Sequence, residues 1–260
     1  MKEPIYTKQY DKLQVNVFDT AEAMGNAAAL AIADDMKRII REKGSLRMMF
    51  AAAPSQDTTL KALLAIEDIP WNKVNAFHMD EYLGISEEAS QSFRNFLNRS
   101  LFSKKKFGSV HLIKGDASDS QAEADRYEAL LREEPLDIVL LGVGENGHIA
   151  FNDPPEASFT EPAFAKIIAL DMKSRVQQVH DGCFTTLEDV PKYAITVTIP
   201  AFMQAKVLHC VVPNSRKADA VQATVLGPVD EKCPASILRT HDDAHLYLDK
   251  FSAEKLFEEK

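Results

Sequence analysis

The segment from Leu141 to Pro154 holds the residues best suited to chemistry, in the order Leu-Gly-Val-Gly-Glu-Asn-Gly-His-Ile-Ala-Phe-Asn-Asp-Pro. Three of the 10 glycines of the chain lie here, with His148 directly after the third and the carboxylate of Asp153 shortly beyond it. Histidine exchanges protons near neutral pH. The apolar run 136–141 before this turn predicts a buried strand. Such a strand would place His148 and the backbone N–H groups at the carboxyl edge of a sheet, where open α/β folds bind ligands.

The same segment also matches the dinucleotide-binding pattern Gly-x-Gly-x-x-Gly. That pattern binds a pyrophosphate only where a helix begins at its third glycine, here Gly147. Two prolines, Pro154 and Pro155, follow after a few residues, and consecutive prolines do not fit inside a helix. The sequence therefore argues against a nucleotide site.

A second chemical segment runs from Phe77 to Gly84, where an apolar strand-like run ends in two adjacent carboxylates, Asp80 and Glu81. Charged residues in loops are mostly solvated, so an exposed strand end is one interpretation. Adjacent residues of a strand point to opposite faces. Only one of the two carboxylates can therefore face a site shared with His148.

Stretches of strand and helix character alternate along the chain, which predicts an open, mostly parallel, Rossmann-like α/β sheet with helices on both faces. A single domain is expected over residues 1–260. The segment 153–173 is the least regular and is expected to be mobile over the site. The expected strands are 46–53, 74–79, 110–113, 136–141, 194–199, 207–212 and 244–248, and the expected helices are 20–43, 58–66, 90–102, 120–132, 215–224 and 235–238.

The composition indicates a soluble, enzyme-sized protein, with 45% hydrophobic and 27% charged residues. The net charge of −9 argues against binding to nucleic acid or to a membrane surface. An anionic substrate would therefore need a locally positive pocket. Three cysteines without metal-ligand spacing, and the lack of a signal-like or membrane-spanning apolar stretch, predict a cytoplasmic protein with reduced thiols and no metal.

Together these segments resemble the glucosamine-6-phosphate deaminase/isomerase family, whose relatives include the 6-phosphogluconolactonases. The strand end Asp80-Glu81-Tyr82 matches one family pattern, and residues 142–154 match the pattern Gly-x-Gly-x-x-Gly-His-Ile-x-Phe-Asn-Glu/Asp-Pro. A third match is Pro213-Asn214-Ser215-Arg216-Lys217, where a strand leads to a lysine in the first turn of a helix. The resemblance covers nearly the whole chain.

The resemblance implies that His148 opens the sugar ring, that Asp153 orients its imidazole, and that Asp80 is the base for the proton on C2. Backbone N–H groups of the turn, including those of Gly144 and Gly147, would stabilise the intermediate. Lys217 would bind the phosphate at a helix N-terminus. No metal or organic cofactor is required.

Asn146 departs from the family pattern, because many members carry an aspartate two residues before the histidine. An amide can hold a hydrogen bond at this catalytic position but cannot accept a proton. A carboxylate–histidine–carboxylate relay would therefore lose one of its ends.

The phosphate loop departs further. The family's Thr-Gly-x-Thr turn is replaced by the glycine-free residues 51–58. Ser55, Gln56 and Thr58 can still donate hydrogen bonds, whereas Asp57 would repel a phosphate if it faced inward. The arginine that the family places over the site aligns nearest to His180, and Arg175, one turn away, could replace it. The expected substrate contacts are thus Ser55, Gln56, Thr58, Gly144, Gly147, Arg175, His180 and Lys217.

Three functions remain open. The first is isomerisation and deamination of an amino-sugar phosphate, such as glucosamine-6-phosphate or galactosamine-6-phosphate, to a ketose phosphate and ammonia. The second is an enzyme of the same fold that acts on another sugar phosphate or a sugar lactone, although Ile149–Asn152 is of the deaminase kind. The third is a sugar-phosphate-binding regulator without turnover. A small-molecule sugar phosphate is the expected partner, and a homo-oligomer is possible.

Overall fold

The computed structural model describes residues 3–154 and 156–257, so Pro155 and the chain ends at residues 1–2 and 258–260 lie outside the described part. Eight strands form a sheet in the order β1-β2-β11-β10-β7-β3-β4-β6. All neighbours from β2 to β6 pair in parallel, and only β1 pairs antiparallel with β2. The expected mostly parallel α/β sheet is confirmed. Its strands are β1 (Tyr6–Tyr10), β2 (Leu13–Phe18), β3 (Leu46–Phe50), β4 (Val74–His78), β6 (Ser109–His111), β7 (Ile138–Leu141), β10 (Val207–Val212) and β11 (Ala244–Asp249).

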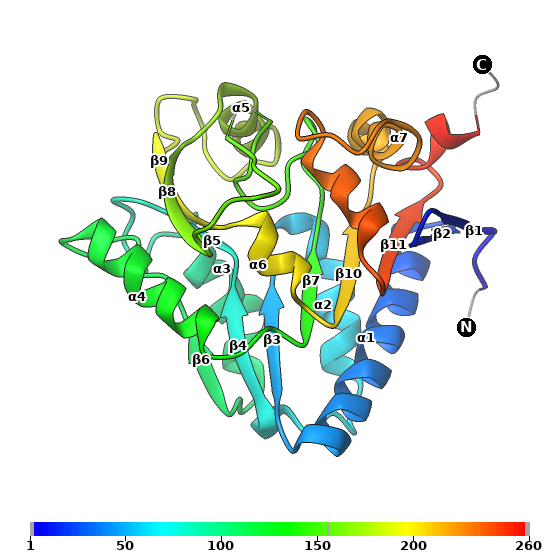
Figure 1. Cartoon of the computed structure of the whole chain (residues 1–260), viewed down its shortest axis with the longest axis horizontal. Coiled ribbons are helices and arrows are strands. Elements are labelled where there is room, and N and C mark those ends of the chain that lie inside the picture. The colour runs from blue at the N-terminus through cyan, green and yellow to red at the C-terminus, as the bar shows by residue number, and fades with distance from the viewer. Residues whose placement is uncertain (1–2, 155, 258–260) are drawn as a thin grey trace.

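The strand order reverses between β3 and β7. From β3 the chain adds β4 and β6 on one side, then returns to place β7, β10 and β11 on the other side. The loops that leave β3 and β7 therefore diverge at this point and open a crevice at the carboxyl edge, which is the usual binding place in such sheets. In Figure 1 the arrowheads of β3, β4, β7 and β10 all point toward the end of the molecule where α5 lies.

Helices cover both faces of this sheet. They are α1 (Ala21–Lys43), α2 (Asp57–Ala65), α3 (Phe93–Ser100), α4 (Ser120–Arg132), α5 (Met172–His180), α6 (Ile199–Met203) and α7 (Ala218–Leu226). Helix α1 illustrates how the sequence sets the two ends of a helix. The Thr20 hydroxyl accepts a hydrogen bond from the Ala23 N–H and caps the start of α1, whereas Gly44 at φ 83° closes its end.

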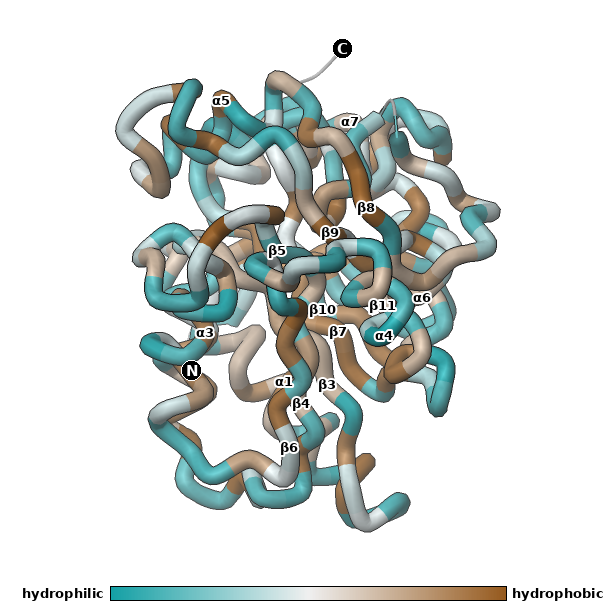
Figure 2. Tube along the Cα trace, turned by 90° about the vertical axis from the view of Figure 1, so that its left-hand side faces the viewer, coloured by the Kyte–Doolittle hydropathy of each residue, from teal (hydrophilic) through white to brown (hydrophobic). Residues whose placement is uncertain are grey.

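The inner strands β3, β4, β7, β10 and β11 are buried on both faces, and their side chains alternate between two hydrophobic layers. In β7, Val139 and Leu141 pack with the layer beneath α4, α6 and α7, whereas Ile138 and Leu140 pack with the layer beneath α1, α2 and α3. Figure 2 shows hydrophobic residues along the central strands and hydrophilic ones along many outer loops. Because both faces are covered, such strands are nearly continuous apolar runs.

A second, antiparallel sheet of three strands lies above the carboxyl edge of the first (Figure 1). It consists of β5 (Asp80–Tyr82), β8 (Ala165–Ala169) and β9 (Tyr193–Val197). Two sequence-based expectations are corrected here. The strand predicted at 194–199 belongs to this small sheet, and the segment 153–173, expected to be irregular, contains β8, which pairs with β9.

In residues 3–154 and 156–257, no helix combines the length and the apolar character needed to cross a membrane.

Candidate active site

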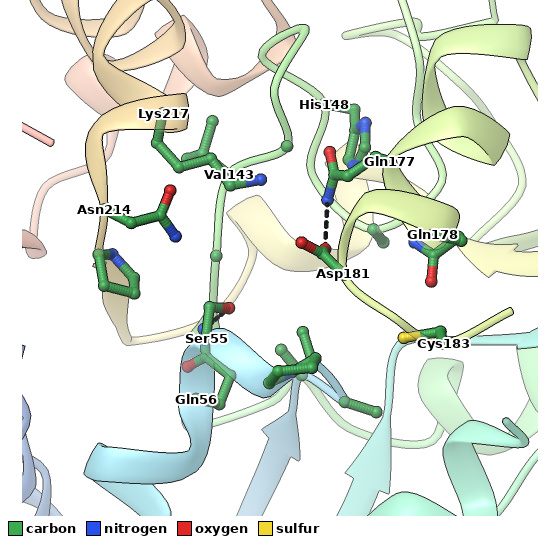
Figure 3. Close-up of a pocket in the computed structure, with 18 of the residues that line it drawn as sticks. Ser55, Gln56, Val143, His148, Gln177, Gln178, Asp181, Cys183, Asn214 and Lys217 are labelled. Carbon is green, nitrogen blue, oxygen red and sulfur yellow. Dashed lines mark hydrogen bonds between the residues drawn. The ribbon is translucent and has the colours of Figure 1, made fainter. Parts of the chain in front are cut away.

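A cavity of about 380 Å³ opens at the reversal point of the strand order. Its walls come from the segments that follow β3, β4, β7 and β10, together with α5 and the loop after it (Figure 3). Among the residues that line it are Ser55, Gln56, Thr58, Asp80, Gly144, His148, Gln177, Gln178, His180, Asp181, Cys183, Asn214, Arg216 and Lys217. The three segments singled out in the sequence thus meet at one cavity.

The two adjacent carboxylates of β5 have different environments. Asp80 lines the cavity, is 7% exposed, and forms no side-chain hydrogen bond with any described residue. Burial, together with the negative charge of Glu81, raises the pKa of Asp80 well above its ordinary value. Glu81 instead caps the start of α3, where it accepts hydrogen bonds from the backbone N–H groups of Phe93 and Arg94 and from the Ser92 hydroxyl. Only Asp80 is therefore available to a ligand.

The His148 imidazole is held through its Nδ1 atom. This nitrogen lies 2.7 Å from Asn146 Oδ1, 3.0 Å from Asp153 Oδ1 and 2.9 Å from Ser174 Oγ. The Asn146 amide donates to Asp153 at 2.9 Å, and the Ser174 hydroxyl also donates to Asp153. Because both oxygens facing Nδ1 from Asn146 and Asp153 are acceptors, Nδ1 carries a hydrogen. Nε2, which has no partner among the described residues, is then the free proton acceptor of the neutral ring.

Asp153 lies behind the histidine and does not line the cavity. Its burial opposes ionisation, but the hydrogen bond and charge of His148, with the hydrogen bonds from Asn146 and Ser174, outweigh it and hold the pKa of Asp153 below its ordinary value. Asp153 therefore stays ionised and stabilises a protonated His148.

Two glycines of the turn after β7 are required by geometry. At Gly144 a Cβ atom would lie 2.1 Å from the imidazole of His148, so the ring packs directly on this residue. Gly147 has φ +84°, which side chains rarely adopt, and it faces Cys233 rather than the cavity. Gly144 thus lines the site, whereas Gly147 shapes the turn. The expectation that their N–H groups stabilise an intermediate is wrong, because the N–H of Gly144 donates to the His148 carbonyl at 2.9 Å and that of Gly147 to the Gly144 carbonyl at 3.0 Å.

Lys217 lies 5% exposed on the cavity wall, at the end of the short 3₁₀ helix Ser215–Lys217 that leads into α7. None of the described residues accepts a hydrogen bond from its ammonium or pairs with it. Burial lowers the pKa of Lys217, an effect that Arg216 reinforces and that Asp181 and Glu145 oppose. A buried ammonium without a protein partner is suited to an anionic ligand.

The glycine-free loop after β3 lies below Asn214 and Lys217 in the view of Figure 3. Gln56 is fully buried, and its amide donates to the Val211 carbonyl at 3.3 Å and to Ser55 Oγ at 3.2 Å. This amide therefore ties the loop to the end of β10. The Ser55 hydroxyl lies at the cavity wall.

Two further residues of this loop behave differently from their neighbours. Thr58 contributes to the cavity wall, but its hydroxyl lies against Gly25 of α1 and has no hydrogen-bond partner in the described chain. Asp57 is exposed and does not line the cavity. The acid that could repel a phosphate is thus turned away from the site.

The basic residues expected over the site are separated by the structure. His180 lines the cavity, 3.7 Å from Glu145. Arg175 does not line it, because its guanidinium donates to the carbonyls of Leu187 and Val190 at 2.7 and 2.9 Å. Arg175 therefore holds the loop after α5 in place instead of facing a substrate.

Sequence reasoning missed several polar residues of α5 that the structure brings to the site. Ser174 contacts His148 and Asp153, and Gln177 accepts from the Glu145 N–H at 2.9 Å and donates to Asp181 at 3.3 Å. Gln178 and Asp181 line the cavity. A cluster of uncharged polar residues beside Arg175 was the available signal, but its placement depends on the long-range contacts of α5.

In the described residues, no group of three or more His, Cys, Asp or Glu side chains could hold a metal ion.

The sequence matches the family model described as glucosamine-6-phosphate isomerases/6-phosphogluconolactonase over residues 19–247. The chain belongs to this family. A glucosamine-6-phosphate deaminase from Streptococcus suis is 36% identical over 220 residues, which cover 84% of this chain and 92% of the relative. A glucosamine-6-phosphate deaminase from Listeria monocytogenes is 37% identical over 215 residues, which cover 82% of this chain and 89% of the relative.

Solved structures of the family agree with this assignment. A monomeric glucosamine-6-phosphate deaminase superposes with a TM-score of 0.85 at 28% identity, over 92% of this chain and 98% of the other. The 6-phosphogluconolactonase of Thermotoga maritima gives a TM-score of 0.76 at 18% identity, over 92% of this chain and 100% of the other. At that identity the lactonase shows a shared fold and no more.

Proposed function

We propose that this chain is a glucosamine-6-phosphate deaminase that converts its substrate to a ketose phosphate and ammonia. The observation that carries the proposal is that an unpartnered, buried Asp80 carboxyl and the oriented His148 imidazole share one cavity with the unpaired Lys217 ammonium. The curated relatives with 36–37% identity, which are named as deaminases, support it.

The proposed reaction begins with ring opening. Nε2 of His148 accepts the proton of the anomeric hydroxyl and returns a proton to the ring oxygen, while Asp153 balances the charge of the imidazolium. Asn146 Oδ1 accepts a hydrogen bond from Nδ1 where a second carboxylate would also supply negative charge. The relay therefore rests on one carboxylate, Asp153.

In the open chain, Asp80 removes the proton from C2 and delivers it to C1. The C1 carbonyl oxygen takes up a proton and becomes a hydroxyl, while the C2 amine gives up a proton and becomes an imine, so the step is an isomerisation without net gain or loss of protons. Water then adds to C2 and ammonia leaves, so the net reaction consumes one water and releases one ammonia. The raised pKa of Asp80 makes it a stronger base than an ordinary carboxylate.

Lys217, with hydroxyl and amide donors of the β3 loop such as Ser55, is proposed to bind the phosphate. The loop without glycine is the observation that favours a second candidate, the same reaction on a related sugar phosphate. Three free cysteines, Cys183, Cys210 and Cys233, support a cytoplasmic location for the enzyme.

The test is ammonia and ketose release from the purified protein, measured over glucosamine-6-phosphate, galactosamine-6-phosphate, unphosphorylated glucosamine and 6-phosphogluconolactone. We expect turnover of an amino-sugar phosphate and none of the lactone. Lactone hydrolysis without ammonia release would replace the proposal with the lactonase function. Binding without any turnover would indicate a regulator.

A further inference from the structure

Two neighbouring glutamines of α5 differ in their contacts. Gln177 uses both ends of its amide, toward the Glu145 N–H and the Asp181 carboxylate. The Gln178 side chain forms no hydrogen bond with any residue of the described chain, although it is only 8% exposed and lines the cavity. Figure 3 shows its amide directed from α5 into the cavity.

The amide of Gln178 is accessible from the cavity, because neither its nitrogen nor its oxygen is among the fully buried polar atoms that lack a partner. Most polar side chains with so little exposure are hydrogen-bonded within the protein, so an amide that instead faces a cavity without a protein partner is open to water or to a ligand. The two donors and the acceptor of this amide are therefore available for a ligand.

The charges around the cavity indicate which part of the ligand Gln178 meets. Figure 3 places Lys217 and Asn214 on the wall opposite Gln178. Asp181, three residues beyond Gln178, also lines the cavity, and its carboxylate is neutralised by Arg216 at 3.1 Å. A phosphate beside Gln178 would thus lie away from the buried ammonium, whereas a hydroxyl can both donate to an amide and accept from it.

We propose that Gln178 is a specificity residue that binds a hydroxyl group of the sugar, while Lys217 binds its phosphate. This inference rests on the proposed function for the identity of the ligand. It assigns the neutral polar part of the substrate to α5 and the anionic part to the start of α7.

The test measures binding in an Asp80→Asn background, in which the substrate is not consumed. Dissociation constants for glucosamine-6-phosphate and for inorganic phosphate are compared by calorimetry with and without Gln178→Leu. We expect Gln178→Leu to weaken the sugar phosphate about tenfold, as the loss of one hydrogen bond in a desolvated site does. Inorganic phosphate should bind as before. Lys217→Ala, the matched control, should weaken both ligands.

A Gln178→Glu variant separates hydroxyl from phosphate recognition. A carboxylate still accepts a hydrogen bond from a hydroxyl but would repel a phosphate bound beside it. Because the phosphate is assigned to Lys217 on the opposite wall, we expect Gln178→Glu to leave the binding of inorganic phosphate unchanged. Weaker phosphate binding in Gln178→Glu, equal weakening of both ligands in Gln178→Leu, or unchanged affinity for the sugar phosphate would each overturn the inference.

Thermal unfolding controls for a structural role. Gln178→Leu should keep or raise Tm, because it replaces an unpaired amide, whereas Gln177→Leu should lower it. If Gln178→Leu does not fold, Gln178→Met serves in its place. Turnover by the wild type is scored separately, so absent ammonia release would reject the deaminase function while the binding data still decide on Gln178. Absent affinity for the sugar phosphate would reject both.

Discussion

Two carboxylates of the site have their pKa values displaced in opposite directions. Burial and Glu81 raise the pKa of Asp80, whereas His148, Asn146 and Ser174 together hold that of Asp153 below its ordinary value. Pairs of this kind mark acid and base roles in enzymes. Asp80 is suited to take a proton from carbon, and Asp153 to remain charged beside the imidazole.

Asp80→Asn should therefore lower kcat by a factor of roughly 10²–10⁴, because it removes the base and keeps the shape. Affinity for the substrate should change little. Steady-state ammonia release and calorimetric binding measure the two effects. Asp57→Asn, a change at an exposed carboxylate at the start of α2, is the control and should retain wild-type rates. Near-wild-type kcat in Asp80→Asn would mean that another residue is the base.

The pH profile of kcat/KM should have an acidic limb set by Asp80 and an alkaline limb set by Lys217. Asp80 acts unprotonated, and its pKa is raised, so activity should rise with pH through a value above the 3.8 of an ordinary aspartate. Lys217 binds phosphate protonated, and its pKa is lowered, so activity should fall with rising pH before the 10.5 of an ordinary lysine. Lys217→Arg should move the alkaline limb to higher pH. An alkaline limb that stays in place would assign it to another group.

The sequence predicted those residues of the site whose types are unusual in their local sequence context. His148 after three glycines, Asp80 after an apolar strand and Lys217 at a helix start all line the cavity. Gln178 could not be predicted, because a glutamine on a short helix is most often solvated. The orientation of Arg175 was also beyond the sequence, since the carbonyls that bind it belong to a loop without regular structure.

At the scale of elements, α5 connects the turn after β7, which carries His148, with the cavity wall. Ser174 contacts His148, Gln177 binds the backbone of the turn after β7, and Arg216 pairs with Asp181 at 3.1 Å. The helix spans only Met172–His180 and carries no broad apolar stripe, so periodicity alone did not reveal it. The pairing of the short strands β5 and β8 could not be predicted either, because their common partner β9 is distant in sequence.

Arg175→Ala should lower the free energy of unfolding by about 2 kcal/mol, since the hydrogen bonds of a charged donor to two carbonyls are lost. Urea denaturation measures this loss. KM for the sugar phosphate should change far less than in Lys217→Ala, because Arg175 does not line the cavity. Lys173→Ala on the same helix, where the side chain is exposed, is the control. A large rise in KM with unchanged stability would restore Arg175 as a substrate contact.

At the scale of the molecule, the strands that the sequence revealed are those that form mostly apolar runs. The inner strands β3, β4, β7, β10 and β11 are buried on both faces and were predicted as apolar runs. The edge strand β1 is exposed at most positions and was missed together with its partner β2. The net charge of −9 makes the unpaired Lys217 notable, because it supplies positive charge inside an acidic protein.

Described residues of a single chain line the cavity and supply the partners that orient His148. We therefore expect specific activity to stay constant when the enzyme is diluted over roughly a thousandfold range, whether or not copies associate. Ammonia release is measured at each dilution with a carrier protein present, and sedimentation over the same range reports the association state. A fall in specific activity that follows dissociation would show that a second copy completes or stabilises the site. Constant activity through dissociation would show that one copy suffices for catalysis.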